Sequence, residues 1–248
     1  MYFLKNTNIN ALKYPSRAAA VIMQSVENFI APGIHSIDID KFITCLARKQ
    51  NVTAATLDYK GFQKSSCISI NNVVCHGIPS KSSVLNHGDI VNIDLTLFKD
   101  GYYGDLSKSF CVGKSTQKSK ALVKIAEEAL YLGINEIKIG KQIGNIGYII
   151  QKHAEKYNYN IVTKYSGHGI GKIFHGYPMI YHHGYLNTNA IIREGMCFTV
   201  EPILNEQSGF TYVLEDQWTI KTIDSALSAQ FEHTVLVTRG GYKILTKL

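Results

Sequence analysis

The 248-residue sequence predicts a single α+β domain in which two similar halves build an antiparallel sheet. Two observations predict this class. Helical segments precede groups of short strand-like segments, whereas a doubly wound fold would alternate single strands with single helices. The order of two helices followed by strands occurs in residues 15–115 and again in residues 116–245. Because no linker stands out between the halves, we treat residues 1–248 as one domain.

The two halves align at an offset of 100 residues. Residues 33–43 share six identities in eleven positions with residues 133–143, without a gap. We interpret these identities as a trace of duplication, which predicts a pseudo-two-fold sheet covered by two pairs of helices, with a site between the halves. The identical pairs are Gly33 and Gly133, Ile34 and Ile134, Ile37 and Ile137, Ile39 and Ile139, Lys41 and Lys141, and Ile43 and Ile143.

The first half opens with two predicted helices. Ser16 is the expected N-cap of the first helix, and the Ala-Pro-Gly sequence of residues 31–33 stops it. The second helix is expected from Ser36 or Asp38 to about Gln50, with one apolar face. The segments expected next are short strands and loops in residues 52–80 and a turn in residues 86–89.

Residues 90–112 predict a β-hairpin. Apolar and polar residues alternate as in a half-buried strand, and the Asp-Gly pair at residues 100–101 suits a type I′ turn, which needs positive φ. With that turn, Thr96 faces Asp105, and Asp94 lies one diagonal step away, about 7–8 Å between backbones. Two acids this close repel each other unless a cation lies between them. The hairpin therefore indicates either a metal site or a solvated polar strand face.

The second half repeats the order of the first. Two helices are expected, over residues 116–132 and 142–157. Residues 163–183 contain a loop rich in Gly and His. Strand-like segments fill the rest, at residues 159–165, 194–205, 218–222, 231–238 and 242–246.

Glu201 and Glu232 are acids within apolar, strand-forming segments of the second half. Such acids are rarely buried without a partner. If the halves pack about a pseudo-two-fold axis, these carboxylates converge with Asp94 and Asp105. Four carboxylates can share one site only when about two divalent cations, or protons, neutralise them.

Histidine is the usual nitrogen ligand of such a site, and the local sequence ranks the nine histidines. His168 lies in Ser-Gly-His-Gly-Ile-Gly, whose glycines permit close approach to a ligand, and His76 and His175 lie beside glycine at loop or strand ends. His233 is expected to face away from Glu232 in a regular strand, which argues against it as a ligand. The others are expected on polar loops or helix surfaces: His35, His87, His153, His182 and His183.

Composition narrows the class of protein. A hydrophobic fraction of 45% and a charged fraction of 18% are those of an ordinary soluble globular protein. No apolar run approaches the roughly 18 residues of a membrane span, and the N-terminal sequence lacks the features of a secretory signal. Five scattered cysteines without a CxxC pair favour reduced thiols and a cytoplasmic location. The net charge of +7 reflects either an acidic partner such as RNA or dispersed solubilising charge.

Several catalytic and nucleotide-binding motifs are not supported. Residues 167–172 (GHGIGK) look like a nucleotide loop but lack the third glycine of GxGxxG and the spacing of a P-loop. Because the sequence contains neither GxSxG nor HExxH, it gives no support to a serine hydrolase or a zincin.

Five sequence blocks combine these features: CISINNVVCHGIP, VNIDLTLFKDGYYGDLSKSF, GHGIGKIFH, FTVEP and LSAQFEHT. In these blocks, and over about residues 15–245, the chain resembles the type I methionine aminopeptidases in their bacterial short form. The sequence departs from common family patterns at Thr56, where Cys is frequent, at Phe62, where Tyr is common, and in Tyr-Gly-Asp-Leu at residues 103–106. None of these departures touches an expected metal ligand.

The resemblance implies a duplicated pita-bread fold and a site for two divalent metal ions, of Co, Mn, Fe or Zn. It implies that Asp105 and Glu232 bridge the ions and that Glu201 also transfers protons. His76 and His175 are similar to the two histidines that hydrogen-bond the substrate and stabilise the tetrahedral intermediate. The implied metal ligands are Asp94, Asp105, His168, Glu201 and Glu232. The implied apolar pocket for the methionine side chain comprises Tyr59, Phe62, Cys67, Phe174 and Trp218; ordinary core packing is the alternative role of each.

The function that the resemblance implies is removal of the initiator methionine from new polypeptides whose second residue is small. The enzyme would be a cytoplasmic monomer that does not bind membranes, and transient contact with the ribosome is a hypothesis supported by the net charge. Two alternatives are a proline-directed aminopeptidase of the same fold and a non-catalytic relative that binds RNA or ribosomes. The first usually carries a large extra N-terminal domain, and the second typically loses metal ligands.

Overall fold

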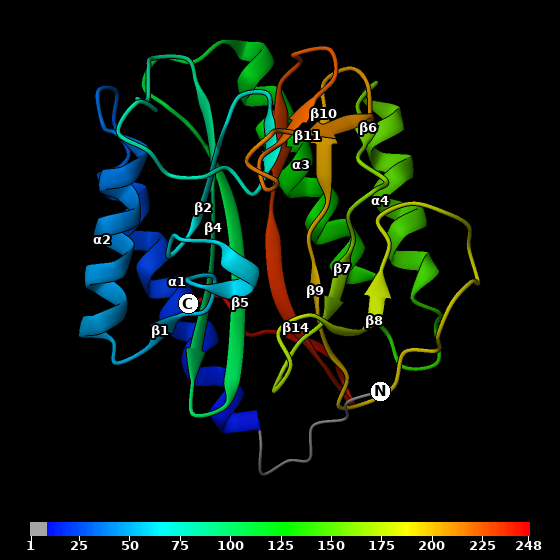
Figure 1. Cartoon of the computed structure of the whole chain (residues 1–248). Coiled ribbons are helices and arrows are strands. Elements are labelled where there is room, and N and C mark those ends of the chain that lie inside the picture. Colours follow the sequence, from blue (N-terminus) through cyan, green and yellow to red (C-terminus); the bar gives the residue numbers. More distant parts are fainter. Residues whose placement is uncertain (1–8) are drawn as a thin grey trace.

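The computed structural model describes residues 9–248, in which four α-helices lie against a curled antiparallel sheet (Figure 1). The predicted α+β class, with two pairs of helices, is confirmed. No helix in these residues is long and apolar enough to cross a membrane. The helices are α1 (Ile9–Phe29), α2 (Ser36–Lys49), α3 (Gln117–Asn135) and α4 (Gly144–Lys156), with a short 3-10 helix, η2 (Tyr59–Gly61).

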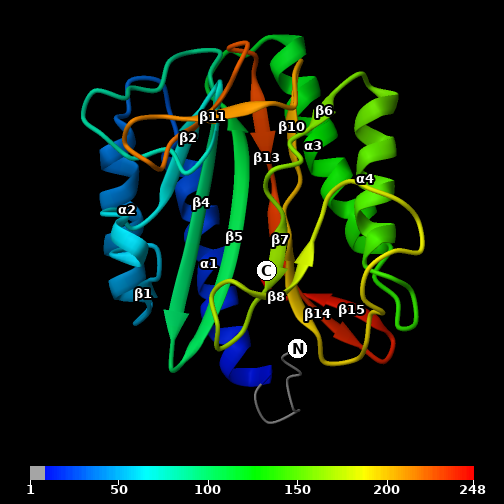
Figure 2. The same cartoon turned by 45° about the vertical axis from the view of Figure 1, so that its right-hand side comes forward.

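The main sheet is built by strands from both halves, and its two central strands come one from each (Figure 2). In spatial order its strands are β1 (Thr53–Ala54), β4 (Ile90–Lys99), β5 (Tyr102–Cys111), β14 (Glu232–Thr238), β9 (Cys197–Val200), β7 (Gly167–Gly169) and β8 (Gly176–Ile180); β2 (Cys67–Ile70) also pairs with β4, and β15 (Gly241–Ile244) with β14. Two smaller sheets comprise β13 (Ser228–Gln230), β10 (Ile203–Asn205) and β6 (Asn160–Ile161), and β11 (Thr211–Val213), β12 (Ile220–Thr222) and β3 (Val73–Cys75).

The order β4-β5-β14-β9 at the centre of the main sheet relates the halves by an approximate two-fold axis. Strand β5 of the first half pairs with β14 of the second, and β4 and β9 flank this pair. Each half also has its own large hydrophobic cluster. One consists of residues between 18 and 112, and the other, apart from Ile90, of residues between 122 and 237. The polar groups at the β5–β14 seam therefore lie between two apolar cores.

The β4–β5 hairpin has the predicted register. Thr96 pairs with Asp105 and Asp94 with Ser107, and the pairs run without a break from Ile90 to Lys99. Asp100 and Gly101 form the turn with φ of +49° and +83°, the positive values that a type I′ turn requires. Because no bulge interrupts the ladder, Asp94 and Asp105 share one face of the sheet.

The predicted start of the first helix is wrong. Helix α1 includes Ile9 and passes through Pro15, so Ser16 is an interior residue rather than an N-cap. The Ser16 hydroxyl donates to the Leu12 carbonyl within the helix. This stretch packs closely on β5, because a Cβ at Gly104 would overlap the backbone of Ser16. The second helix lies within one residue of its predicted end.

The ungapped offset of 100 residues does not align equivalent positions, although the order of helix pairs is confirmed. Gly33 lies beyond the end of α1 and has a φ of +89°. Gly133 lies inside α3 and packs against Ile150. Helices α2 and α4 begin at Ser36 and Gly144, which are 108 residues apart. The six identities thus reflect shared residue types around helix ends rather than one register.

The predicted loop at residues 163–183 contains two strands, β7 and β8. Neither strand shows an alternation of polar and apolar side chains, because β7 is Gly-His-Gly and β8 carries apolar side chains on both faces. A Cβ at Gly167 would overlap the Thr199 carbonyl, and one at Gly169 would overlap the Tyr177 carbonyl. Glycine is therefore needed where β7 passes its neighbours. Strand β11 was not predicted either.

We expect Gly104→Ala to lower the free energy of unfolding by about 1–3 kcal/mol, because α1 must move away from β5 to admit the new methyl group. The measurement is the midpoint of urea unfolding. Gly240→Ala is the matched control, since nothing lies within 4 Å of a Cβ built there. Equal unfolding free energies for the two variants would contradict this account of the α1–β5 contact.

Candidate metal centre

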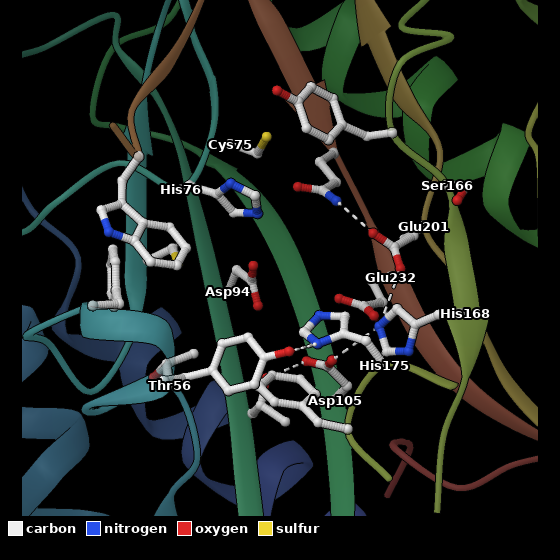
Figure 3. Close-up of a pocket in the computed structure, with 18 of the residues that line it drawn as sticks. Thr56, Cys75, His76, Asp94, Asp105, Ser166, His168, His175, Glu201 and Glu232 are labelled. Atoms are coloured by element: carbon white, nitrogen blue, oxygen red, sulfur yellow. Dashed lines mark hydrogen bonds and ion pairs between the residues drawn. The ribbon is translucent and has the colours of Figure 1, made fainter. Parts of the chain in front are cut away.

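One central pocket, with a volume of about 280 Å³, opens between the two halves (Figure 3). All twelve residues that the sequence predicted for the site line it. The predicted metal ligands in it are Asp94, Asp105, His168, Glu201 and Glu232; the other predicted residues are Tyr59, Phe62, Cys67, His76, Phe174, His175 and Trp218. The lining residues that were not predicted as site residues are Thr56, Lys60, Cys75, Thr96, Tyr165, Ser166, Ile203 and Gln230.

The strand register brings the acids and one histidine together. Ligand atoms of Asp105, His168 and Glu232 lie within 4.8 Å of one another, and all three side chains are buried. His168 Nε2 lies 3.7 Å from Asp105 Oδ2 and 3.7 Å from Glu201 Oε1. Asp94 lines the same cavity from β4 (Figure 3). The predicted convergence of four carboxylates is thus observed.

Burial dominates the electrostatics of these acids. It raises the pKa of Asp94 to about 7 and raises the pKa of Asp105, Glu201 and Glu232 well above their ordinary values. Repulsion by neighbouring carboxylates adds to burial at Asp105, Glu201 and Glu232. Among residues 9–248, no Lys or Arg forms an ion pair with any of the four.

This donor set fits divalent metal ions. Glu232 Oε1 is buried and has no hydrogen-bond donor among the described residues, so this acceptor stays unsatisfied unless a ligand binds it. Burial lowers the pKa of His168 to about 4, which keeps the imidazole neutral and able to bind a cation. Oxygen-rich sites with one nitrogen suit Mn, Fe, Co and Zn. The carboxylates can stay ionised in this cavity only beside a positive charge.

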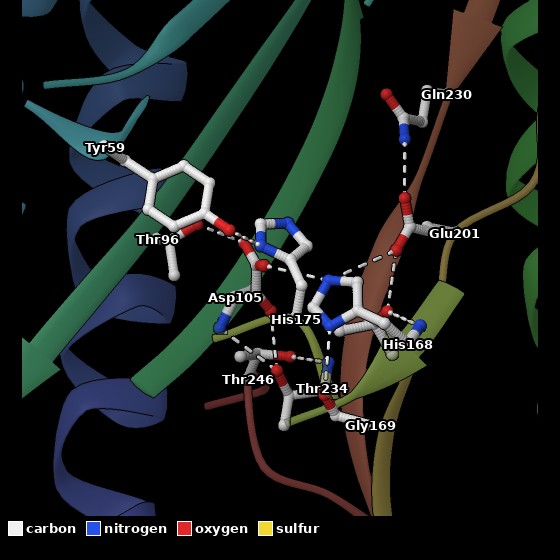
Figure 4. A network of polar contacts seen from close by, with 11 residues as sticks. Tyr59, Thr96, Asp105, His168, Gly169, His175, Glu201, Gln230, Thr234 and Thr246 are labelled. Carbon is white, nitrogen blue, oxygen red and sulfur yellow. Dashed lines mark hydrogen bonds and ion pairs between the residues drawn. The ribbon is translucent and has the colours of Figure 1, made fainter. Parts of the chain in front are cut away.

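Hydroxyl groups fix the orientation of two carboxylates (Figure 4). Thr96 Oγ1 donates to Asp105 Oδ1 at 2.7 Å, and Thr199 Oγ1 donates to Glu201 Oε1 at 2.6 Å. Thr234 Oγ1 donates to the Asp105 carbonyl and accepts from the Asp105 amide, which joins β14 to β5. These bonds hold the carboxylates in place while leaving other oxygen atoms free for a ligand.

His182 is a buried residue that the sequence analysis placed on a polar surface, and that prediction is wrong. Its Nε2 accepts a hydrogen bond from the Glu201 amide at 3.0 Å, and the side chain is 1% exposed. Burial lowers the pKa of His182 to about 3, so the ring stays neutral and can accept this bond. The sequence carries no clear signal for this burial, because the exposed residues Tyr177, Met179 and Tyr181 that alternate with the buried ones are also apolar or aromatic.

His233 faces away from the cavity, as predicted. Its Nε2 lies 3.2 Å from the Tyr131 hydroxyl and its Nδ1 lies 2.9 Å from Thr246 Oγ1. Thr246 also accepts a hydrogen bond from the Thr234 amide. These contacts attach the C-terminal segment behind β14, on the side opposite Glu232.

His76 and His175 approach the cavity from different loops. His76 has a φ of +55°, and its ring centroid lies 6.0 Å from that of Trp218. His175 Nδ1 lies 2.9 Å from the Tyr59 hydroxyl. Burial lowers the pKa of both histidines, that of His175 to about 3. Both rings are therefore neutral near pH 7, and each can donate one hydrogen bond and accept another.

Aromatic rings form an apolar lobe beside the acids. Phe62 meets Trp218 edge to face, with 5.1 Å between ring centroids, and Tyr59 lies 4.8 Å from Phe174. Cys67 is buried at the same pocket. Such a lobe suits a slender apolar side chain of a ligand.

Comparisons with known proteins find relatives along nearly the whole chain. The model of metallopeptidase family M24 matches residues 10–239. The methionine aminopeptidase of Buchnera aphidicola subsp. Baizongia pistaciae is 44% identical over 247 residues, which cover 98% of this chain and 93% of the relative. The crystal structure of methionine aminopeptidase from Rickettsia prowazekii has a TM-score of 0.97 and 40% identity, with 99% of both chains covered. That of Thermotoga maritima has a TM-score of 0.98 and 34% identity, with both chains covered completely.

Proline-directed enzymes share the fold but match less well. The prolidase from Pyrococcus furiosus is 23% identical with a TM-score of 0.79. The match covers 99% of this chain but only 65% of the prolidase, so that enzyme contains a further third with no counterpart in the aligned region. This likeness extends to the fold alone.

Replacement of Asp94 by Asn should remove a pH-dependent cost of folding. The folded state holds a proton on Asp94 up to about pH 7, whereas the unfolded chain releases it near pH 4. The folded state thus binds the extra proton between these values, and wild-type stability falls relative to Asp94→Asn as the pH rises from 4 to 7, by up to about 1.4 kcal/mol per pH unit.

The measurement is urea unfolding with a chelator present, at several pH values. Taking the difference between variant and wild type cancels the opposite contribution of the buried histidines. Asp100→Asn, at the exposed turn of the same hairpin, is the matched control and should differ from wild type by a constant amount. A flat difference for Asp94→Asn as well would contradict the assigned burial of its charge.

Proposed function

The chain belongs to metallopeptidase family M24, and on this premise we propose that it is a methionine aminopeptidase, a metal-dependent hydrolase that removes the N-terminal methionine from new polypeptides. The observation that carries the proposal is one pocket that holds two buried carboxylates (Asp105 and Glu232), two half-buried ones (Asp94 and Glu201) and His168 beside an apolar aromatic lobe. The relatives named methionine aminopeptidase match nearly the full chain, which confirms the resemblance seen in the five sequence blocks.

We propose that two divalent ions bind at Asp94, Asp105, His168, Glu201 and Glu232. The central position of Asp105 on β5 and Glu232 on β14 supports a bridging role for these two carboxylates. Bound ions would polarise the scissile carbonyl and supply hydroxide near neutral pH. The donor atoms are equally suitable for Mn, Fe, Co and Zn, so the supply of each metal decides which one binds.

The chain's own groups would move protons and hold the substrate. Glu201 would take a proton from water and return it to the leaving amine, a role supported by contacts that orient its carboxylate: Thr199 Oγ1 donates to one oxygen and Gln230 Nε2 lies 3.5 Å from the other. Neutral His76 and His175 would donate hydrogen bonds to the substrate carbonyl as negative charge develops on its oxygen. Tyr59 holds the His175 ring through its hydroxyl.

The aromatic lobe would receive the methionine side chain. An unbranched thioether fills a narrow pocket without the steric conflict of a β-branched side chain, and sulfur packs well against aromatic rings. Tyr59, Phe62, Phe174 and Trp218 supply these rings, and Cys67 supplies the remaining apolar contact. A small second residue of the substrate is expected from the likeness to methionine aminopeptidases.

Two alternative functions have less support. A proline-directed peptidase shares only the fold with this chain. A non-catalytic RNA-binding relative is disfavoured because all five expected ligand residues are present and line one pocket.

We further propose that residues 1–248 act as one domain, since both halves contribute ligands. We also propose that the protein works in the cytoplasm as a monomer with its five cysteines reduced.

Release of methionine from a Met-Ala-Ser peptide should require a divalent metal and both central carboxylates. We expect Asp105→Ala and Glu232→Ala to lower kcat/KM by more than about a thousandfold, because each removes a charge that holds the ions. Product release after titration of the chelated protein with Mn, Fe, Co or Zn is the measurement. Glu215→Ala, an exposed acid, is the matched control and should keep full activity. Undiminished turnover by either ligand variant would refute the mechanism, and faster cleavage of an Xaa-Pro peptide would favour the proline-directed alternative.

We also propose transient, charge-driven contact with the ribosome, where the substrate emerges from an acidic RNA surface. The net charge of +7 supports it. Co-sedimentation with ribosomes should fall steeply as the salt concentration rises from about 50 to 200 mM. Absent or salt-independent co-sedimentation would remove this proposal and leave the peptidase activity untouched.

A further inference from the structure

Two exposed lysines stand at the central pocket, one from each half of the chain. Lys60 lines the pocket from η2, and Lys164 directly precedes the lining residues Tyr165 and Ser166. Each ammonium lies near the ring of a pocket tyrosine: Lys60 Nζ is 5.4 Å from the Tyr59 centroid, and Lys164 Nζ is 6.0 Å from the Tyr165 centroid. Within residues 9–248 neither lysine forms an ion pair with an acid.

The backbone conformation at Lys60 determines where the Tyr59 and Lys60 side chains lie. Lys60 has φ of +48° and ψ of +30°, in the left-handed region that a lysine rarely adopts. The turn is closed by the Phe62 amide, which donates to the Tyr59 carbonyl. This turn directs the Tyr59 side chain toward His175 in the pocket (Figure 4) and leaves the neighbouring Lys60 exposed. Unusual backbone angles of this kind concentrate at functional sites.

The lysine charges reach the pocket but are not needed to balance its acids. Lys60 contributes to the lowered pKa of His175, after burial and His168, and Lys164 partly offsets the rise that burial causes in the pKa of Cys75. Two divalent ions would already neutralise the four carboxylates. The lysines therefore add positive charge beside the pocket.

We propose that Lys60 and Lys164 determine specificity beyond the scissile bond by favouring substrates with a carboxylate at the third or fourth residue. This inference rests on the proposed peptidase function, because it needs the methionine side chain in the aromatic lobe. An extended peptide advances about 3.3 Å per residue, so its third and fourth residues come within reach of long lysine side chains around the pocket opening. A lysine or arginine at those substrate positions would be repelled.

Peptides that differ only at the third residue test the proposal: Met-Ala-Glu, Met-Ala-Gln and Met-Ala-Lys, each with an amidated C-terminus. A fourth peptide, Met-Ala-Gln with a free C-terminus, separates a terminal carboxylate from a side-chain carboxylate. For the metal-loaded wild type we expect kcat/KM for the Glu peptide to exceed that for the Lys peptide about three- to tenfold. The difference should arise from a lower KM for the Glu peptide, and its size is that expected of two exposed charge pairs. The ratio should approach one at about 0.5 M salt.

The variants identify the residues responsible. The double variant Lys60→Gln and Lys164→Gln should lower the Glu/Lys ratio to below about two, and Lys60→Glu with Lys164→Glu should invert it. Lys156→Gln is the matched control, because Lys156 Nζ also lies near a tyrosine ring, 5.5 Å from the Tyr157 centroid, but on α4 away from the pocket. It should keep the wild-type ratio.

Fluorescence gives a second readout that needs no catalysis. Trp218 is the only tryptophan and lines the pocket, so titration of metal-free protein with each peptide reports binding directly. The Glu peptide should bind more tightly than the Lys peptide to the wild type, and the two peptides should bind equally well to the double glutamine variant.

Cleavage of all peptides at one rate by the wild type, or a Glu/Lys ratio that is unchanged in the double glutamine variant, would overturn the proposal. So would loss of ribosome co-sedimentation in that variant with an unchanged ratio, which would assign the lysines to RNA. Failure of every metal-loaded peptide assay would instead count against the peptidase function.

Discussion

Four carboxyl groups share one buried cavity, and the rest of the molecule is arranged around this constraint. Burial raises the pKa of all four groups, and repulsion by neighbouring carboxylates adds to it at Asp105, Glu201 and Glu232. His168 Nε2 lies 3.7 Å from Asp105 and from Glu201. The acids come from both halves, so neither half could form the site alone. Pairing of β5 with β14 places Asp105 and Glu232 at the seam, and β4 and β9 bring Asp94 and Glu201 to its two sides.

A polar layer makes this seam rigid between two apolar cores. Asn92 Nδ2 and Ser109 Oγ both donate to the Gln230 carbonyl, which ties the hairpin to β13. The Gln230 side chain in turn approaches Glu201, and His182 accepts from the amide of the same residue. Because these hydrogen bonds join specific buried groups, small shifts of a strand would leave those groups unsatisfied. Precise register and a preorganised site therefore arise from the same bonds.

Local patterns predicted the parts of the fold that depend on local physics. Alternation and an Asp-Gly turn were enough to set the hairpin register that pairs Thr96 with Asp105. Strand β7 was missed because its glycines are required by neighbouring backbones, which a single sequence does not reveal, and β8 was missed because apolar side chains lie on both of its faces. The buried role of His182 was lost with them. The helix start at Ser16 was misplaced because a proline usually marks a first turn, whereas here α1 continues through Pro15 and packs on Gly104.

Metal binding and folding are coupled at this site. Without ions, the folded state keeps protons on groups that the unfolded chain would have released, and ionisation near neutral pH opposes folding. A divalent ion replaces those protons, so metal affinity should rise with pH until the carboxylates are ionised. The same cation that supplies reactivity then stabilises the folded state by mass action. Because oxygen donors and one imidazole suit several transition metals, the free concentration of each metal, more than the geometry of the site, decides which one binds.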